Sequence, residues 1–490
     1  MKSEKYLKAL AHLAGGAYTA LFLFCATLRL LYPYEVEWNE GAVLDHAIRV
    51  LHGLPIYAAP SLDFAGFVYT PLYYYVTAGV MAIGGVGLWA GRLISILATL
   101  GTAILISIIV YRESRDSRHR RFLAISGAML YLAFYHSTGF FYDIVRMDAL
   151  GVLLAVASVY VALYLRKGYI IAAVLVALAY FTKQQMIFVW PGLAIYFFLR
   201  RKSEAVGFVI VSIGILLAGT VAVNWATNGW YRFYTYTIPS TKAAAQFSWL
   251  AALDFFPNSM LGTFGLFTIV ILLSLLLHRN WKANHKFIGI LICGGCAMLS
   301  ASLSLGNPGG YANVLMPLVV FFAMLLAIGI GSVEVIIPGW TSLAPVLMII
   351  AYLALAFNPM GEIMLFASPR QREAGQQFIA KLREISGDVW IPFHGYIGTL
   401  AGKPTHVHFM AMNDALVPKD ARSLRFQQVI DSSLAAHCFS AIILDEERVF
   451  GWDSIPPYSR DGKIFSEPNI FLSRIGSAPT RPQYIYLPSK

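Results

Sequence analysis

The chain has 490 residues, of which 58% are hydrophobic and only 13% are charged. A soluble globular domain carries roughly 25% charged residues, so this composition excludes a soluble protein over most of the chain and predicts a polytopic membrane protein. The net charge of +11 does not indicate a nucleic-acid partner, because the basic residues gather in short loops between apolar runs, as the positive-inside rule requires.

Apolar runs long enough to cross a bilayer follow one another along residues 1–357. A helix needs about 20 residues to span the ~30 Å hydrocarbon layer. We expect about eleven such helices, near residues 10–31, 91–111, 122–140, 149–165, 168–182, 186–199, 206–226, 260–277, 287–304, 314–332 and 336–357. The first run follows several lysines and lacks a small-residue cleavage pattern, so we expect it to remain as a helix.

The charges between the runs predict their orientation. Lysines precede the first helix, and basic clusters follow the second helix and then occupy every second loop, which places these loops and the amino terminus in the cytoplasm. This alternation requires that the apolar segment 69–85 does not cross the membrane. From Thr70-Pro71 onward it would extend about 21 Å as a helix, which is short of the hydrocarbon thickness. We therefore predict an embedded, non-crossing helix within an outer loop over residues 32–89.

The same outer loop contains a second predicted helix, which is amphipathic. Residues 42–51 place apolar side chains at helical spacing opposite charged and polar ones, a pattern typical of a helix on the membrane surface. We expect Asn39 to cap the start of this helix and Gly53 to end it. The helix would hold Glu37 and Glu40 at the boundary between water and lipid.

From about residue 358 the composition changes to charged residues, prolines and short alternating stretches. Helices are expected near 371–385 and 426–437, and strands near 389–393, 441–444 and 484–487. The predicted fold is thus a polytopic α-helical membrane domain over residues 1–357, followed by a small α/β domain over residues 358–490. An odd number of crossings from a cytoplasmic start places the second domain outside the cytoplasm.

Charged residues cluster in the outer segments, where a neighbouring hydrocarbon layer makes them costly and therefore candidates for function. The acids are Glu37, Glu40 and Asp148, and the bases are Arg92, Arg146 and Lys183. Taken singly, each is also explained as a solvated loop charge or a snorkelling side chain. Together they suit transfer from an anionic lipid-linked donor, because a carboxylate can take a proton from an acceptor hydroxyl and cations can stabilise a leaving phosphate.

A glycine-rich outer loop lies between the predicted helices at 287–304 and 314–332, over residues 306–313. Its backbone could wrap a ligand, or the loop could be a tight connection between two helices. We favour the tight connection.

Five short motifs occur in a familiar order: Glu37-Trp-Asn-Glu-Gly41, Gly53-Leu-Pro-Ile-Tyr57, Tyr69-Thr-Pro-Leu-Tyr73, Arg146-x-Asp148 and Asn313-Val-Leu-Met-Pro317. This pattern resembles the GT-C superfamily of integral membrane glycosyltransferases, to which the protein O-mannosyltransferases and the bacterial lipid A aminoarabinose transferases belong. The resemblance extends over residues 1–330 and leaves the carboxyl-terminal domain outside it.

The resemblance implies an inverting transfer of a sugar from a polyprenyl-phosphate carrier to a cell-envelope acceptor, on the outer face of the plasma membrane. A first-loop carboxylate acts as general base in this family. Many relatives have Asp-Glu where this chain has Asn39-Glu40, so either Glu37 or Glu40 serves, and we favour Glu37. The second acid of the family matches Asp148.

The resemblance also implies the substrate contacts. Arg146 and Lys183 would contact the donor phosphate, and Arg92 is a further candidate for that role. Substrate contacts are expected from residues within the matched motifs, namely Tyr57, Tyr69, Tyr73 and Asn313. Members of the family differ in metal use, so a divalent metal ion is left open and no cofactor is assigned.

The main alternative is a transporter or a flippase for a lipid-linked sugar, in which buried charges bind substrate without chemistry. Its signature would be Gly- or Pro-broken helices paired between two halves of the chain, and no such pairing occurs in the sequence. A non-catalytic assembly protein would not need Glu37, Asp148 and Lys183. The expected partners are the lipid-linked donor, the acceptor and membrane lipid, with no nucleic acid.

Overall fold

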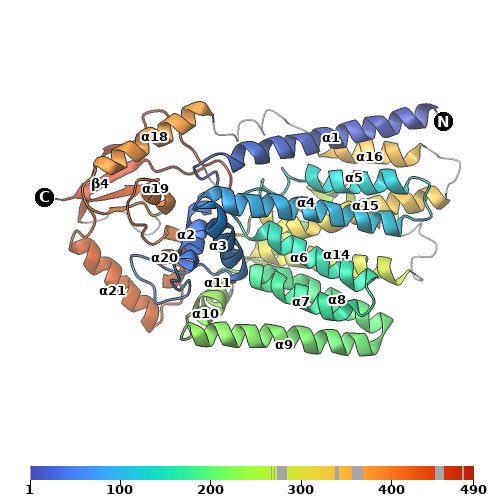
Figure 1. Ribbon diagram of the computed structural model, residues 1–490, viewed down its shortest axis with the longest axis horizontal. Coiled ribbons are helices and arrows are strands. Elements are labelled where there is room, and N and C mark those ends of the chain that lie inside the picture. Colours follow the sequence, from blue (N-terminus) through green and yellow to red (C-terminus); the bar gives the residue numbers. More distant parts are fainter. Residues whose placement is uncertain are drawn as a thin grey trace.

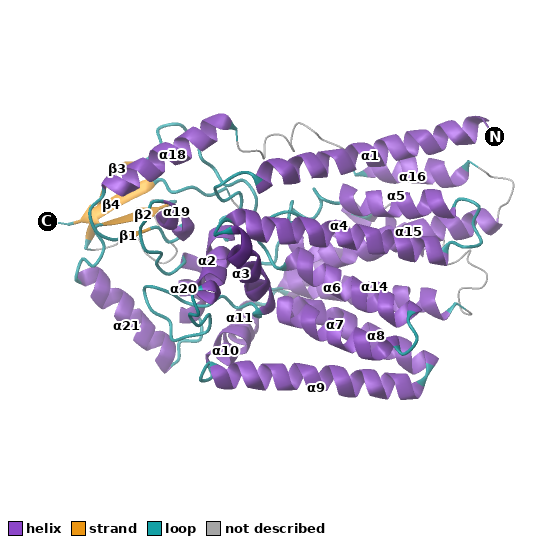
Figure 2. Ribbon diagram, in the orientation of Figure 1, coloured by secondary structure: helices purple, strands orange, loops and turns teal. Residues whose placement is uncertain are grey.

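The computed structural model describes residues 2–265, 267–269, 271–272, 284–336, 342–355, 368–446, 457–476 and 479–489. A bundle of long helices adjoins a smaller unit that contains all of the described strands (Figures 1 and 2). The amino terminus lies at the far end of the bundle, and the carboxyl terminus lies at the opposite end of the molecule, in the smaller unit (Figure 1).

The bundle is built from ten described helices whose sequences are largely apolar. They are α1 (Lys2–Leu30), α4 (Leu88–Glu113), α5 (Arg120–Ala133), α6 (Asp148–Tyr164), α7 (Gly168–Thr182), α8 (Val189–Arg200), α9 (Lys202–Ala226), α14 (His285–Gly306), α15 (Met316–Ile336) and α16 (Leu343–Ala354). Among the described residues, five segments are long and apolar enough to cross a membrane: Ser3–Leu30, Leu88–Glu113, Lys202–Ala226, His285–Gly306 and Ala312–Val333. The predicted helices at 260–277 and 336–357 lie partly outside the described residues, so the predicted number is not tested.

One predicted helix is shorter than its apolar pattern indicates. Residues 122–140 are expected to be helical throughout, but α5 ends at Ala133. The chain adopts left-handed backbone conformations at Gly139 (φ 68°) and Phe140 (φ 64°), which cannot continue a right-handed helix. The turn brings Asp143 back to the bundle core, where it pairs with Arg29.

The outer loop leaves the bundle and re-enters it at the same end. Arg92, near the start of α4, donates from Nη1 to the carbonyl oxygens of Arg29 and Tyr32, at the end of α1, at 2.6 Å each. Between these points α2 (Glu40–Leu51) and α3 (Leu72–Gly84) lie side by side at the junction with the smaller unit (Figure 1). A non-crossing segment would have this geometry, and its position relative to a membrane stays a prediction.

Short irregular helices connect α9 to the following part of the chain at the same end of the bundle. They are α10 (Trp230–Arg232), the π-helix η2 (Phe233–Thr237), α11 (Ile238–Gln246), α12 (Trp249–Phe255) and the π-helix η3 (Phe256–Thr263). Two 3₁₀ turns, η1 (Gln184–Phe188) and η5 (Ala312–Leu315), precede α8 and α15. Both 3₁₀ turns contribute residues to the site described below.

The smaller unit contains a four-stranded mixed sheet. Its elements are α18 (Pro369–Glu384), β1 (Val389–Trp390), α19 (Gly395–Leu400), α20 (Phe409–Leu416), α21 (Ala421–Ala435), β2 (Ala441–Leu444), β3 (Tyr458–Lys463) and β4 (Tyr484–Pro488). The strand order is β1-β2-β4-β3, with β1 parallel to β2 and the other pairs antiparallel. Strands occur at the three predicted places, and β3 is an additional strand that the sequence pattern does not predict.

The smaller unit shares a hydrophobic core with the outer loop. Val43 of α2 and Phe67 of the outer loop belong to the same buried cluster as Trp390 and Phe409. Each of these side chains is at most 5% exposed. The unit is therefore packed directly against the segment that contains Glu37 and Glu40, and the two together form one end of the molecule (Figure 1).

Candidate functional site

A cavity of about 480 Å³ lies where the bundle meets the smaller unit. Its polar lining includes Glu37, Asn39, Tyr69, Arg146, Lys183, Gln184, Gln185, Tyr311 and Asn313. The glycine-rich loop forms one wall through Asn307, Pro308, Gly309 and Gly310. The cavity has the size of a small-molecule site. The glycine-rich loop, which we expected to be only a tight connection between helices, is part of its lining.

Glu37 brings a buried carboxylate to this cavity. Its Oε1 accepts from the Nδ2 of Asn39 at 3.0 Å, and its Oε2 lies 3.5 Å from Nη1 of Arg146. Burial raises the pKa of Glu37 above its ordinary value, although the charge of Arg146 acts in the opposite direction. A carboxyl group with a raised pKa that faces a cavity is suited to accept a proton near neutral pH.

Asn39 holds Glu37 instead of capping the helix. The predicted side-chain cap of α2 is wrong, because no hydrogen bond joins the Asn39 side chain to the helix start. Its amide and its backbone N–H both donate to the Glu37 carboxylate. A buried carboxylate needs such donors more than the end of a helix does.

Arg146 provides a cation in the lining of the cavity. Its Nη2 donates to Tyr69 Oη at 3.3 Å, and its guanidinium lies over the rings of Tyr69 and Phe141, 5.7 Å from each centroid. Its Nη1 forms the ion pair with Glu37, and its Nε has no hydrogen-bond partner within the described part of the chain. A guanidinium that lines a cavity is suited to bind an anion.

Lys183 provides the second cation, at the carboxyl end of α7. Its Nζ lies 2.6 Å from Oδ1 of Asp148, and Nδ2 of Asn313 donates to the same oxygen at 2.9 Å. Lys183 and Asn313 line the cavity, whereas Asp148 lies behind them and is fully buried. Asp148 thus fixes a lysine and an amide in the wall of the cavity.

Glu40 and Arg92 form a separate, fully buried pair. The Nε and Nη2 of Arg92 donate to the two carboxylate oxygens at 2.9 and 2.7 Å. The backbone N–H groups of Val36 and Val145 also donate to Glu40. Neither residue of the pair is among the described residues that line the cavity, and together they tie α2, α4 and the loop before α6 to one another.

Of the three tyrosines predicted to contact substrate, one lines the cavity and two do not. Tyr69 lines the cavity. Tyr57 donates to the carbonyl oxygen of Tyr69 at 2.6 Å, and Tyr73 donates to that of Gly91 at 3.1 Å. Both are buried and lie outside the cavity lining within the described chain. The structure therefore brings together Glu37, Tyr69, Arg146, Lys183 and Asn313.

Two lining residues come from the smaller unit, and sequence reasoning missed both. Met410 of α20 and Gly476 line the cavity. Nothing in the sequence near these residues signals a site, since neither carries a charge or belongs to a recognised motif. Only the packing of the unit on the outer loop brings them there.

The cavity does not fit a divalent metal ion. Glu37 is bound by Asn39 and Arg146, and Asp148 is bound by Lys183 and Asn313. In the described ranges, no group of three or more histidine, cysteine or acidic side chains is placed to hold a metal. No chemical step proposed below uses one.

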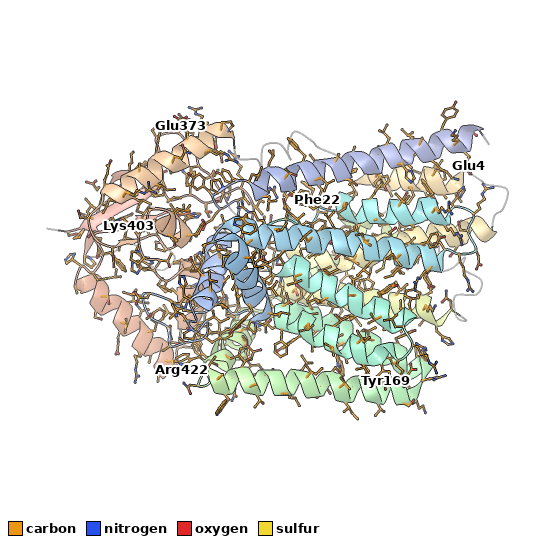
Figure 3. All side chains as sticks on the ribbon, viewed as in Figure 1. Glu4, Phe22, Tyr169, Glu373, Lys403 and Arg422 are labelled. Carbon is orange, nitrogen blue, oxygen red and sulfur yellow. The ribbon has the colours of Figure 1, made fainter. Side chains whose placement is uncertain are left out.

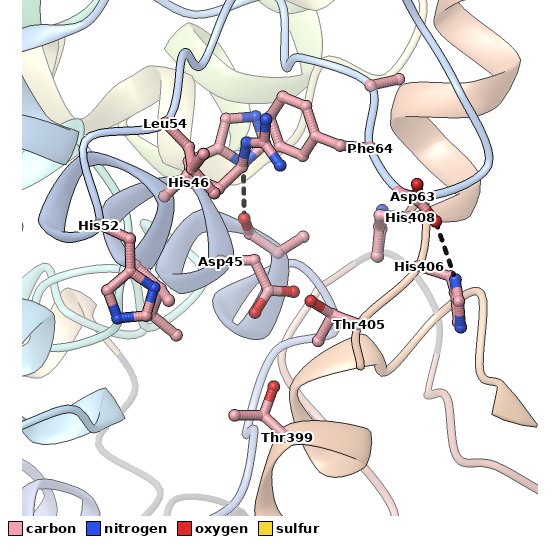
Figure 4. A pocket seen from close by; sticks show the side chains of 14 residues that line it. Asp45, His46, His52, Leu54, Asp63, Phe64, Thr399, Thr405, His406 and His408 are labelled. Atoms are coloured by element: carbon pink, nitrogen blue, oxygen red, sulfur yellow. Dashed lines mark hydrogen bonds and ion pairs between the residues drawn. The ribbon is translucent and has the colours of Figure 1, made fainter. Parts of the chain in front are cut away.

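A second, smaller cavity of about 190 Å³ lies between α2 and the segment before α20 (Figure 4). Its two buried histidines are engaged by backbone groups: His46 contacts the carbonyl oxygen of Ala42 and the N–H of Phe67, and His408 accepts from the N–H of Met410. Burial lowers the pKa of His46 to about 4 and that of His408 to about 3. Both are neutral structural groups at physiological pH.

Gly41 allows α2 to approach Glu35 closely. A Cβ at position 41 would overlap Oε1 of Glu35 and lie 2.8 Å from Cβ of Tyr396. Gly41→Ala is therefore expected to lower the free energy of unfolding by about 1–3 kcal/mol, measured by thermal unfolding in detergent. Gly79→Ala in α3 is the matched control, since a Cβ added there would meet no atom within 4 Å. Equal melting of the two variants would contradict the close packing.

Comparisons with known proteins agree with this architecture. The family described as dolichyl-phosphate-mannose-protein mannosyltransferase matches residues 68–226. Crystal structures of ArnT from Cupriavidus metallidurans, bound to undecaprenyl phosphate and apo, are similar over 96% of this chain and 97% of theirs, with TM-scores of 0.61 and 0.63 at 10% identity. The apo oligosaccharyltransferase of Archaeoglobus fulgidus is similar over 89% of this chain and 70% of its own, with a TM-score of 0.51 at 10% identity. No curated protein matches the chain in sequence.

These findings define the class of protein. The chain is a multi-pass helical membrane protein with the fold of ArnT. Its predicted resemblance to the GT-C superfamily is confirmed by this fold and by the mannosyltransferase family match.

Proposed function

We propose that the protein is a membrane glycosyltransferase that moves a sugar from a polyprenyl-phosphate donor to a cell-envelope acceptor, with inversion at the sugar. The observation that carries this proposal is the convergence of Glu37, Arg146 and Lys183 on one cavity. The fold supports the choice of donor, because ArnT, which shares it, has been crystallised with undecaprenyl phosphate.

Glu37 is the general base of the proposed reaction. Its carboxylate takes the proton of the acceptor hydroxyl while the acceptor oxygen forms a bond to the anomeric carbon. The bond between that carbon and the phosphate oxygen breaks at the same time, and polyprenyl phosphate leaves with the bonding electrons. A single displacement of this kind inverts the anomeric configuration.

Arg146 and Lys183 hold the phosphate and stabilise the charge that it gains as it leaves. Charge-assisted hydrogen bonds to phosphate are among the strongest that a protein can make. Asp148 acts through Lys183 as a positioning residue, since its carboxylate binds the lysine and does not itself line the cavity.

The cavity is proposed to open on the outer face of the plasma membrane. Glu4, at the start of α1, lies at the opposite end of the bundle (Figure 3). The basic loop before α5 lies there too, because its His119 and Arg118 contact Glu4 at 2.8 and 3.5 Å. The positive-inside rule assigns such an end to the cytoplasm. The smaller unit and the cavity, at the other end, would then lie outside.

Lys183→Gln tests the phosphate role while keeping a donor for Asp148. We expect kcat/KM for a radiolabelled undecaprenyl-phosphate sugar to fall ~10- to 100-fold, because one charge-assisted contact to the phosphate is lost. The assay uses purified protein with cell-envelope extract as acceptor. Lys381→Gln, on the exposed face of α18, is the matched control. A Lys183→Gln enzyme with wild-type kcat/KM would contradict the assignment.

A further inference from the structure

We infer that His394 of the smaller unit is a positioning residue for Glu37, and that it acts by holding the segment 35–37 in place. This inference rests on the proposed function of Glu37 as the general base. It assigns the smaller unit an indirect part in catalysis, although none of its charged side chains lines the cavity among the described residues.

His394 joins two buried carboxylates that belong to different parts of the chain. Its Nδ1 is hydrogen-bonded to Oε2 of Glu35, and its Nε2 lies 2.9 Å from Oδ2 of Asp445. All three side chains are at most 4% exposed. Both ring nitrogens therefore have a partner. The imidazole links Asp445, which follows β2, to Glu35 of the outer loop.

The charge of His394 agrees with this geometry. Burial alone would lower the pKa of its imidazole, but the charges of Asp445 and Glu35 outweigh burial and raise that pKa to about 10. With both ring nitrogens protonated, the imidazolium can donate to both acidic side chains. Removing this cation would leave two carboxylates close together in a buried site.

Further hydrogen bonds, to backbone groups, hold the segment from Glu35 to Glu37 against the smaller unit. The N–H of Ile475 donates to the carbonyl oxygen of Val36 at 3.0 Å, and Oγ of Ser473 donates to that of Glu35 at 3.3 Å. Glu37 and Ile475 form a parallel β-bridge. The segment 35–37 thus lies as a short strand against residues 473–475, and its last residue presents the catalytic carboxylate to the cavity.

A positioning role predicts a different result from a purely stabilising one. Each of the two phosphate-binding cations has a partner outside this clamp: Tyr69 contacts Arg146, which also pairs with Glu37, and Asp148 holds Lys183. Loosening the segment 35–37 should therefore misplace the base without weakening donor binding. A displacement of about 1 Å at a reacting group can lower a rate ~100-fold.

The test measures kinetics and backbone exchange in the same full-length proteins. His394→Gln is expected to lower kcat ~10- to 100-fold with an unchanged donor KM, and to speed hydrogen–deuterium exchange in residues 33–41. Asp445→Asn, a milder change that keeps an acceptor for Nε2, should shift both readouts in the same direction. His437→Gln, an exposed histidine of the same unit, is the matched control.

The outcomes separate this inference from the proposed function. If His394→Gln leaves exchange in residues 33–41 unchanged, or speeds it while kcat stays at the wild-type value, the positioning role is overturned. The proposed function still holds in that case, provided that the wild-type protein turns over donor. A fall in kcat matched by a rise in donor KM would also overturn it, since the phosphate site would then be the part disturbed. A wild-type protein that turns over no donor would contradict the proposed function, and with it any role in positioning its base.

Discussion

Replacing Glu37 with glutamine is expected to lower kcat about 10²- to 10⁴-fold, the usual contribution of a positioned general base. Glutamine keeps the size of the side chain and can still bind Asn39, but it cannot accept the acceptor's proton. Donor binding should be retained, because Arg146 and Lys183 are unchanged and lose no phosphate contact. The measurement is transfer from a radiolabelled polyprenyl-phosphate sugar, with donor affinity determined separately.

The control for this prediction is another Glu→Gln change that cannot affect the cavity. Glu373 is exposed on the outer side of α18 (Figure 3), and Glu373→Gln should turn over donor at the wild-type rate. Wild-type turnover by Glu37→Gln would show that this carboxylate is not the base. Loss of folded protein in Glu37→Gln would be detected as a lower melting temperature, which we do not expect.

Arg92→Met is expected to have the largest effect on stability, a loss of about 3–5 kcal/mol in the free energy of unfolding. The variant leaves the Glu40 carboxylate buried without its cation, and three carbonyl oxygens lose their donor: those of Arg29, Tyr32 and Tyr34. Chemical unfolding in detergent measures the change. The loss should appear whether or not donor is present, because Arg92 does not line the cavity.

Arg115→Met is the matched control for Arg92→Met. Arg115 lies 3.8 Å from Asp116 on the surface, with both side chains 79% exposed. Exposed pairs of this kind contribute about 0–1 kcal/mol. If Arg92→Met and Arg115→Met had the same free energy of unfolding, the Arg92–Glu40 pair would not stabilise the fold as its contacts indicate.

The Arg92–Glu40 pair also bears on the choice between the two candidate bases. Four donors surround the Glu40 carboxylate, two from Arg92 and two from backbone N–H groups. These donors lower the pKa of Glu40, despite its burial. A carboxylate that is bound in this way is a poor proton acceptor, so Glu40→Gln should act on stability more than on turnover.

The sequence could predict the parts of the fold that depend on local composition. Long apolar runs form the helices of the bundle, because burial of apolar side chains and internal backbone hydrogen bonds favour helices in lipid. The fully apolar strand β2 is predictable for a similar reason. Strand β3, with the sequence Tyr458-Ser-Arg-Asp-Gly-Lys463, is an edge strand with mostly exposed side chains, so no alternating pattern marks it.

The site depends on contacts between distant segments, which spacing does not reveal. Glu37 and Glu40 are three residues apart, yet one faces the cavity and the other faces Arg92, because the extended segment before α2 turns into the helix between them. The bond between His394 and Glu35 joins residues 359 positions apart. No local pattern predicts such a pairing, although the cluster of acids does indicate that the outer loop contains a functional site.

The most direct test of the central claim follows a labelled undecaprenyl-phosphate sugar in proteoliposomes that contain the wild-type protein and envelope acceptor. We predict that the label moves to the acceptor with inverted anomeric configuration, and that undecaprenyl phosphate is released. Movement of the intact lipid-linked sugar across the bilayer, without release of undecaprenyl phosphate, would contradict a transferase and identify a flippase.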